Sequence, residues 1–273
     1  MPGKWLLPIV FVFVFILPLS GAASALSVDG DEAGLIGTAP RLLLAAGENR
    51  SKYEECTLGN AVADAMRIYL DSDVAILCGG DLIGNLYPGE ITRSDLSAIF
   101  SEDRALATAE VTINGLRGIL ETGLSHIVVD EAEKIDGRLS AYDGFPQISG
   151  FILLYDASAP AGERVLEIRI NGKTADPADG TATLTLAATQ FMLDGGYGLP
   201  AIDHTVPSAM TLTSVTARLI RDGMEGYART ERRIRPLGIK EGDLVSLFPL
   251  GFIFIPILIF VLLEIGIRKK DLP

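Results

Sequence analysis

Two apolar segments, one at each end of the chain, limit the part that can fold as a water-exposed domain. Near the N-terminus an apolar run, residues 5–19, follows Lys4 and precedes small residues that end in Ala23-Ser24-Ala25. This order is typical of a secretory signal peptide, so we expect residues 1–25 to be removed; an uncleaved membrane anchor is the alternative. In either case the residues that follow leave the cytoplasm.

The second apolar segment, residues 244–267, lies near the C-terminus. At about 1.5 Å per residue, a helix of this length crosses the hydrocarbon layer of a membrane. The basic residues Arg268, Lys269 and Lys270 follow at once, and such residues are retained on the cytoplasmic side. We therefore expect a single-pass protein of the cell membrane with a cytoplasmic tail at 268–273. Its extracytoplasmic domain is predicted at 40–235, between linkers at 26–39 and 236–243.

The acidic composition and the scarcity of histidine and cysteine exclude several classes of function. The chain has 23 Lys and Arg against 35 Asp and Glu, a net charge of -12. Because nucleic-acid binding needs a positive field, we expect no nucleic-acid partner. Only two histidines, His126 and His204, and two cysteines are present. One copy of the chain cannot build a histidine-rich dinuclear metal centre or a cysteine-rich zinc module, and we expect no metal site and no cofactor.

The central region begins with a helix and a buried strand. Apolar residues recur at helical spacing over residues 55–70, with Thr57 as a candidate N-cap. Residues 73–78 form a short continuous apolar run that ends at Gly79-Gly80, a pattern typical of a strand buried on both faces. Thr92-Arg93-Ser94-Asp95 predicts a capping box at the start of another short helix.

Further elements alternate along the rest of the domain. We expect strands at 109–113, 147–155, 165–170 and 181–187, and helices at 114–124 and 210–223. Asn171-Gly172 is typical of a hairpin turn and predicts that 165–170 pairs with 181–187. These elements indicate an α/β (α+β mixed) fold, with a mixed β-sheet flanked by helices.

Five stretches of the sequence are informative because they occur together and in order. They are Glu55-Cys56-Thr57-Leu58-Gly59-Asn60-Ala61-Val62-Ala63-Asp64-Ala65-Met66, Asp73-Val74-Ala75-Ile76-Leu77-Cys78-Gly79-Gly80, Pro88-Gly89-Glu90-Ile91-Thr92, Gln147-Ile148-Ser149-Gly150 with Tyr155-Asp156-Ala157-Ser158-Ala159-Pro160, and Phe191-Met192-Leu193-Asp194-Gly195-Gly196-Tyr197-Gly198. Over about residues 50–235 they resemble the C-terminal domain of the 5′-nucleotidase family, which holds the sugar and base of the nucleotide.

The same resemblance implies that the hydrolytic machinery is missing from these residues. In the family, a preceding metallophosphatase domain holds two metal ions that activate water and clamp the phosphate. Neither its Gly-Asn-His motif nor a sufficient number of histidines occurs in this sequence. We therefore expect the chain to be catalytically incompetent by itself.

The positions that the resemblance assigns to the ligand are altered. The family loop Asn-Gly-Gly-Gly-Ile-Arg appears here as Cys78-Gly79-Gly80-Asp81-Leu82-Ile83, and the ribose-binding Asp of Gly-Gly-Asp-Gly is replaced by Tyr197. Each lost charge-assisted hydrogen bond costs about 1.5–3 kcal/mol, so tight nucleotide binding in the family's manner is not expected. Gly79-Gly80 could still cradle an anion or form only a tight turn. Asn60 is expected to orient this loop or to make structural contacts.

The family sandwiches the base between two Phe rings, and part of this arrangement is retained in the sequence. Phe191 falls on the second ring position and Phe100 approximately on the first, although the residues around Phe100 differ from the family pattern. Stacking on these rings would hold a nucleoside-like or other planar ligand. The alternative is that both rings belong to the hydrophobic core.

The two cysteines, Cys56 and Cys78, lie at a helix start and a strand end that the family brings together. Because exported proteins with two cysteines usually pair them, we expect a disulfide that contributes about 3 kcal/mol. A reactive thiol is the alternative.

Three hypotheses follow from these residues. The favoured one is a tethered binding or interaction module without catalytic activity of its own. The second is a component of a nucleotide hydrolase that works with a separate metallophosphatase subunit. The third is a structural surface protein whose pocket is closed by the disulfide and filled by Tyr197.

Overall fold

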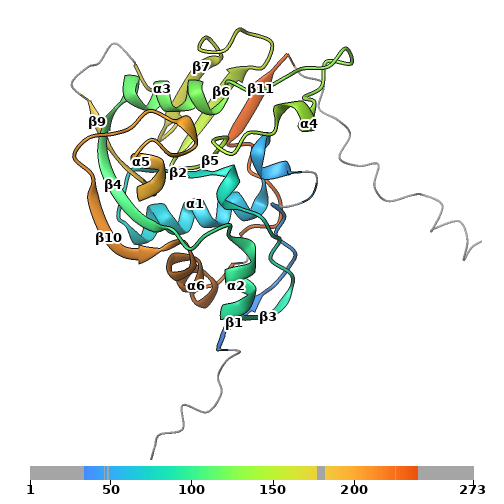
Figure 1. Ribbon diagram of the computed structural model, residues 1–273, viewed down its shortest axis with the longest axis vertical. Coiled ribbons are helices and arrows are strands. Elements are labelled where there is room, and N and C mark those ends of the chain that lie inside the picture. Colours follow the sequence, from blue (N-terminus) through green and yellow to red (C-terminus); the bar gives the residue numbers. More distant parts are fainter. Residues whose placement is uncertain (1–33, 46, 48, 177–181, 225, 239–273) are drawn as a thin grey trace, which may run out of the picture.

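The protein is built around a five-stranded mixed sheet (Figure 1). The computed structural model describes residues 34–45, 47, 49–176, 182–224 and 226–238. In the sheet, β2 runs parallel to β9, and the other neighbouring strands are antiparallel. The strand order is β10 (Val206–Thr211), β4 (Ala105–Thr112), β9 (Thr183–Thr189), β2 (Val74–Cys78) and β5 (Pro146–Ser149).

One face of this sheet is covered by two helices and a small sheet. Helix α1 (Thr57–Tyr69) contacts β2 and β5, and α6 (Leu212–Asp222) packs against α1 and against β1 (Leu35–Ala39). β1 pairs antiparallel with β3 (Gly89–Thr92), which leads into α2 (Arg93–Ile99). The side chains of these elements form one hydrophobic cluster with Ala75 and Leu77 of β2.

The opposite face packs against a second sheet and further helices. The second sheet has the order β11 (Ile234–Leu237), β6 (Phe151–Asp156), β7 (Val165–Ile170) and β8 (Lys173–Thr174). With α3 (Ile113–Gly123) and α5 (Gln190–Leu193) it encloses a second cluster that contains Val74, Ile76 and Cys78 of β2. Because successive side chains of a strand point to opposite faces, β2 contributes to both clusters and is buried throughout. The predicted doubly buried strand is confirmed.

The first helix forms as expected, with one change at its start. Residues such as Leu58, Val62 and Met66 are fully buried, which confirms the helical apolar spacing. The N-cap is Cys56, whose side chain accepts a hydrogen bond from the backbone N–H of Gly59. The hydroxyl of Thr57, the predicted cap, instead accepts from the N–H of Leu44. The capping box of Thr92 and Asp95 at the start of α2 is confirmed.

The predicted strand at 147–155 is two strands in different sheets. Gly150 separates β5 from β6 and has a φ of 88°, a backbone conformation that favours glycine. A Cβ at this position would lie 2.3 Å from the carbonyl oxygen of Asp73. The chain therefore turns sharply at Gly150, and this turn places the end of the apolar run in the second sheet.

The predicted hairpin partner of 165–170 is wrong, although the turn itself forms. Asn171 and Gly172 both have positive φ, and they join β7 to the two-residue strand β8. The next segment, β9, lies in the first sheet between β4 and β2. The Asn-Gly pair predicts the turn but not the partner strand. β9 is buried at four successive residues at its end, as expected for a strand inside the central sheet.

The folded region extends beyond the predicted domain limits at both ends. β1 lies within the predicted linker at 26–39, and β11 reaches Leu237. Within the described residues, no helix has the length and apolar character needed to cross a membrane. The predicted signal peptide at 1–25 and the predicted transmembrane segment at 244–267 lie outside the described residues.

A buried ion pair ties the end of the domain to α1. The carboxylate of Asp64 accepts two hydrogen bonds from the guanidinium of Arg233, at 2.7 and 2.8 Å. The hydroxyls of Ser149 and Tyr227 also donate to Asp64, at 2.5 and 2.9 Å. The side chains of Asp64 and Arg233 are only 15% and 10% exposed, and Arg233 also pairs with the more exposed Glu231 at 3.0 Å. The Asp64 carboxylate therefore relies on Arg233 for its counter-charge.

We predict that Arg233→Ala lowers the free energy of unfolding by about 3 kcal/mol or more, because it leaves the Asp64 carboxylate buried without its counter-charge. Denaturant unfolding of the full chain measures this loss. Arg169→Ala is the matched control, since Arg169 pairs with Glu167 at 2.7 Å but is 40% exposed; its loss should be less than about 1 kcal/mol. Equal losses in the two variants would contradict the structural role of Arg233.

Candidate functional site

Asp81 is the centre of the candidate site. It ends the short 3-10 helix η2 (Gly79–Asp81) that follows β2, and it is fully buried. Its Oδ1 atom accepts hydrogen bonds from Arg104 Nε and from the hydroxyl of Tyr197, each at 2.9 Å. Its other oxygen, Oδ2, is buried and has no hydrogen-bond partner. Burial raises the pKa of Asp81, and the contacts with Tyr197 and Arg104 oppose this rise.

Arg104, which immediately precedes β4, connects Asp81 to the aromatic side chains. Its guanidinium carbon lies 3.8 Å from the ring centroid of Phe191 and 5.8 Å from that of Tyr197. Its Nη1 atom also contacts Glu102 Oε2 at 3.0 Å. The side chain of Arg104 is 16% exposed, so the cation is held against an aromatic face and beside a buried carboxylate.

Tyr197 lies in the 3-10 helix η3 (Gly196–Gly198) with a φ of 56°, in the left-handed region. Its ring makes an edge-to-face contact with Phe191, at a centroid distance of 5.0 Å and an interplanar angle of 83°. The hydroxyl of Tyr142 donates to the carbonyl of Tyr197, and the Tyr142 ring stacks on His126 with centroids 4.2 Å apart. Tyr197 is therefore held at its carbonyl by Tyr142 and at its ring by Phe191, and its hydroxyl donates to Asp81.

The two loop glycines are needed for close packing. The N–H of Gly79 donates to the carbonyl of Phe145 and that of Gly80 to the carbonyl of Asp143, both at 2.8 Å. A Cβ on Gly79 would lie 2.0 Å from the carbonyl oxygen of Ser51. Both N–H groups are thus used within the protein, which favours the tight-turn interpretation over an anion cradle.

Phe100 and Asn60 lie apart from this cluster. Phe100 is 3% exposed and belongs to the hydrophobic cluster on the α1 side of the sheet. Phe191, which is 37% exposed, makes its ring contact with Tyr197. The structure therefore supports the core alternative for Phe100 only. Asn60 of α1 donates to Glu55 Oε1 at 2.7 Å, a contact with the segment before the helix and not with the Asp81 loop.

The predicted disulfide between Cys56 and Cys78 is not formed; both cysteines are free and buried. Cys56 belongs to the cluster on the α1 face, whereas Cys78 points to the opposite face of β2. The thiol of Cys56 is used as a helix cap and also contacts Gln147 Oε1 at 3.5 Å. Burial raises the pKa of Cys56 to about 12 and raises that of Cys78 well above its usual value. Neither is therefore a reactive thiolate at neutral pH.

Sequence reasoning missed Arg104 and Tyr142. Arg104 was overlooked because it is far from Asp81 in sequence and lies in none of the five stretches. A signal was nevertheless present, because Asp81 follows a buried strand after only two glycines, and a buried carboxylate requires a cation or hydrogen-bond donors nearby. Tyr142 gave no comparable signal, since its role depends on the left-handed backbone of Tyr197.

Across the part of the chain that the structure describes, no group of three or more His, Cys, Asp and Glu side chains could hold a metal ion. His126 stacks on Tyr142, and His204 is an exposed residue with a φ of 60°. The chemistry available at the Asp81 cluster is that of a fixed cation, a buried carboxylate and two aromatic rings. This set suits packing or recognition.

We predict that both thiols are unreactive toward a thiol reagent such as 5,5′-dithiobis(2-nitrobenzoate) in the native protein, because they are buried and protonated. After denaturation without a reductant, both should be titrated in each chain. A disulfide would instead give no titratable thiol under these conditions. Reaction of the folded protein at neutral pH would contradict the burial of the two side chains.

Comparison with known proteins places the fold in a family. The sequence model of the 5′-nucleotidase C-terminal domain matches residues 35–204. Protein 5NUC of Lutzomyia longipalpis is 24% identical over 179 residues, which cover 58% of this chain and 30% of that protein. The trifunctional nucleotide phosphoesterase protein YfkN of Bacillus subtilis is 27% identical over 153 residues, or 54% of this chain and 10% of YfkN. The chain thus spans less than a third of the length of either relative.

Solved structures show the same fold. A 5′-nucleotidase precursor from Thermus thermophilus superposes with a TM-score of 0.63 at 22% identity, covering 76% of this chain and 40% of that one. The NAD nucleotidase of Haemophilus influenzae gives a TM-score of 0.58 at 14% identity, covering 74% and 38%. The family model covers more than half of the sequence and the fold agrees, so this chain belongs to the 5′-nucleotidase C-terminal domain family.

Proposed function

We propose that this protein is a membrane-anchored, extracytoplasmic module of the 5′-nucleotidase C-terminal type that binds a partner or ligand and does not hydrolyse nucleotides by itself. The anchor is supported by the apolar segment 244–267 and the basic residues that follow it. Export is supported by the signal-peptide pattern of residues 1–25. The absence of hydrolysis is supported by the two-histidine composition, which cannot supply the family's metal ligands.

One observation supports an interaction role over nucleotide binding: the guanidinium of Arg104 lies on the ring of Phe191. The resemblance assigns the Phe191 position to the base and the Tyr197 position to the ribose. In this protein the guanidinium of Arg104 lies on the Phe191 ring, and the hydroxyl of Tyr197 donates to Asp81. At the two positions that the resemblance assigns to the nucleoside, the protein's own side chains contact one another, and this supports the interaction role.

Moving Arg104 away from the Phe191 ring would break its ion pair with the buried carboxylate of Asp81, which is energetically costly. A base that stacked on the covered face of Phe191 would have to displace Arg104, which would leave Asp81 fully buried without its counter-charge. Breaking a buried ion pair in this way costs about 3–5 kcal/mol. That cost corresponds to a loss of more than about a hundredfold in affinity, which a planar ligand would have to recover from new contacts.

A second role, as a component of a nucleotide hydrolase, is favoured by a different observation. The match covers only 40% of the Thermus thermophilus 5′-nucleotidase precursor, so most of that protein lies outside the matched part. A separate metallophosphatase subunit could supply the metal-dependent chemistry, with this module beside it. In this role the module would contribute through contacts with the subunit, because Arg104 lies on the ring of Phe191 at the position that the resemblance assigns to the base.

We predict that adenosine and AMP do not raise the thermal unfolding midpoint of the full-length protein at millimolar concentration. Binding to the native state would stabilise it by RT ln(1 + [L]/Kd), so a shift reports occupancy directly. The prediction would be contradicted if adenosine raised the unfolding midpoint of the unaltered protein and of the control variant Val206→Ala, which changes an exposed side chain, but not that of Phe191→Ala.

The same preparation separates the two roles in a phosphate-release assay with AMP and divalent metal. The protein alone should release no phosphate above a blank under either role. If an added metallophosphatase released phosphate from AMP faster when this protein was present, the result would support the subunit role and count against an interaction module without a part in hydrolysis. Phosphate release by the purified chain alone would overturn both.

A further inference from the structure

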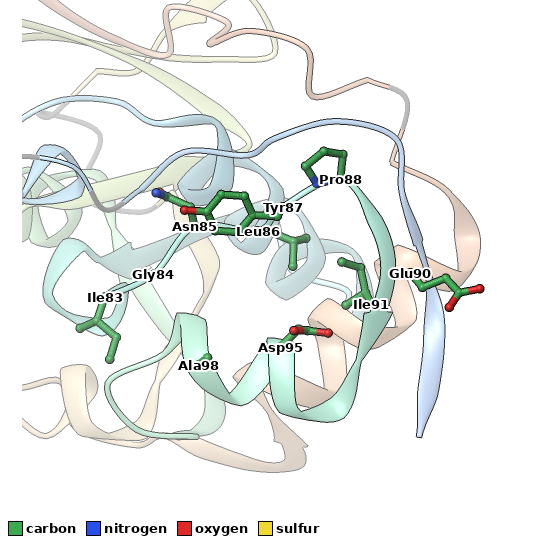
Figure 2. A pocket seen from close by; sticks show the side chains of 10 residues that line it. All are labelled: Ile83, Gly84, Asn85, Leu86, Tyr87, Pro88, Glu90, Ile91, Asp95 and Ala98. Carbon is green, nitrogen blue, oxygen red and sulfur yellow. The ribbon is translucent and has the colours of Figure 1, made fainter. Parts of the chain in front are cut away.

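A groove separate from the Asp81 cluster lies between β3, α2 and the loop that precedes β3. Figure 2 shows the loop that carries Tyr87 and Pro88 running above α2, which carries Asp95 and Ala98. The volume of this β3–α2 groove is about 490 Å³. It shares no lining residue with the Asp81 cluster. The residues that line it are Ile83, Gly84, Asn85, Leu86, Tyr87, Pro88, Glu90, Ile91, Asp95 and Ala98.

The groove presents apolar side chains that the fold itself does not cover. Ile83 and Tyr87 are 55% and 65% exposed, whereas Leu86 and Ile91 are buried. Leu43 pairs antiparallel with Leu86, a register that places Leu42 opposite Tyr87. Leu42 is 41% exposed, so it extends the apolar surface beside the groove. Large apolar side chains that are exposed close together favour a binding surface over scattered solvent exposure.

The charged residues of the groove are both acidic. Asp95 accepts hydrogen bonds from the N–H and hydroxyl of Thr92, at 2.8 and 2.6 Å, and these bonds lower its pKa. Glu90 lies on β3 with its carboxylate directed outward in Figure 2, and it has no ion-pair partner among the described residues. The groove thus combines apolar walls with a negative rim.

Charge selects among the occupants that such a groove could hold. The chain has a net charge of -12, so a second copy of it would meet like charge at this rim. An anionic membrane surface would be repelled for the same reason. A positively charged partner would be attracted by the rim and by the acidic protein as a whole.

We propose that the β3–α2 groove docks a segment of a partner protein that presents an apolar side chain next to a lysine or arginine. The apolar side chain packs against Ile83 and Tyr87, and the cation lies beside Glu90 and Asp95. This inference rests on the proposed interaction role and gives it a surface and a class of partner. It does not involve Phe191 or Arg104, so the nucleoside tests and the groove test can fail independently.

The test measures binding of a fluorescein-labelled peptide of alternating leucine and lysine to the full-length protein by fluorescence anisotropy, at about 0.15 M salt to screen distant charges. Two comparison peptides carry serine in place of leucine or glutamate in place of lysine. The groove variants are Tyr87→Ser and Glu90→Gln. Their matched controls are Leu166→Ser, at a side chain that is 50% exposed on β7, and Glu163→Gln, at an exposed position before β7.

We expect Tyr87→Ser to weaken binding by about tenfold, because it removes most of the apolar contact area. Glu90→Gln should weaken it by about threefold, mainly by slowing association, as expected for a charge at the rim. The two control variants should bind like the unaltered protein, and both comparison peptides should bind more weakly. Thermal unfolding of each variant confirms that it is folded.

Several results would overturn the proposal. Equal losses in the groove and control variants would show that the peptide binds only to the overall negative charge. Equal binding of the glutamate peptide would remove the role of Glu90 and Asp95. A concentration-dependent dimer of the unaltered protein that is lost in Tyr87→Ser, without peptide binding, would assign the groove to a second copy of the chain.

Discussion

The full burial of one carboxylate, that of Asp81, determines how the rest of the candidate site is arranged. A buried charge must be paired, and the guanidinium of Arg104 and the hydroxyl of Tyr197 meet this requirement at one oxygen atom. Arg104 is thereby held against Phe191, and Tyr197 keeps a left-handed backbone that Tyr142 supports from the other side. Contacts between the protein's own side chains therefore link Asp81, Arg104, Phe191 and Tyr197 into one cluster.

Much of the fold could be predicted where local sequence and tertiary packing agree. The spacing of Leu58, Val62 and Met66 gave α1, and Thr92 with Asp95 gave the start of α2. The errors arose where contacts between residues far apart in the sequence determine which strands pair and which side chains meet. The turn at Asn171 was right, but the partner of β7 was not, because strand pairing depends on the sheet that accepts β9. The disulfide failed because the direction of a side chain from β2 alternates, and this places Cys78 on the face away from Cys56.

The candidate site was predicted less completely than the fold. The altered positions Asp81 and Tyr197 were recognised as departures from the family pattern, yet their mutual hydrogen bond requires geometry that sequence spacing does not give. Arg104 belongs to none of the five stretches, and its place in the cluster is given by its contacts with Asp81 and Phe191. The β3–α2 groove was also missed, since Ile83 was considered only as a lost arginine, and its exposure depends on the path of the loop before β3. The Asp81 cluster and the β3–α2 groove are the two features on which the proposed interaction role rests.

A double-mutant cycle between Asp81 and Arg104 tests the closure of the site most directly. The free energy of unfolding would be measured for the unaltered protein, Asp81→Asn, Arg104→Gln and the double variant. If the pair is buried and coupled as described, the interaction energy should be about 2 kcal/mol, and the double variant should lose less stability than the sum of the single losses. Losses that add to within about 0.5 kcal/mol would show that the two side chains act independently, and would contradict an ion pair that holds Arg104 against Phe191.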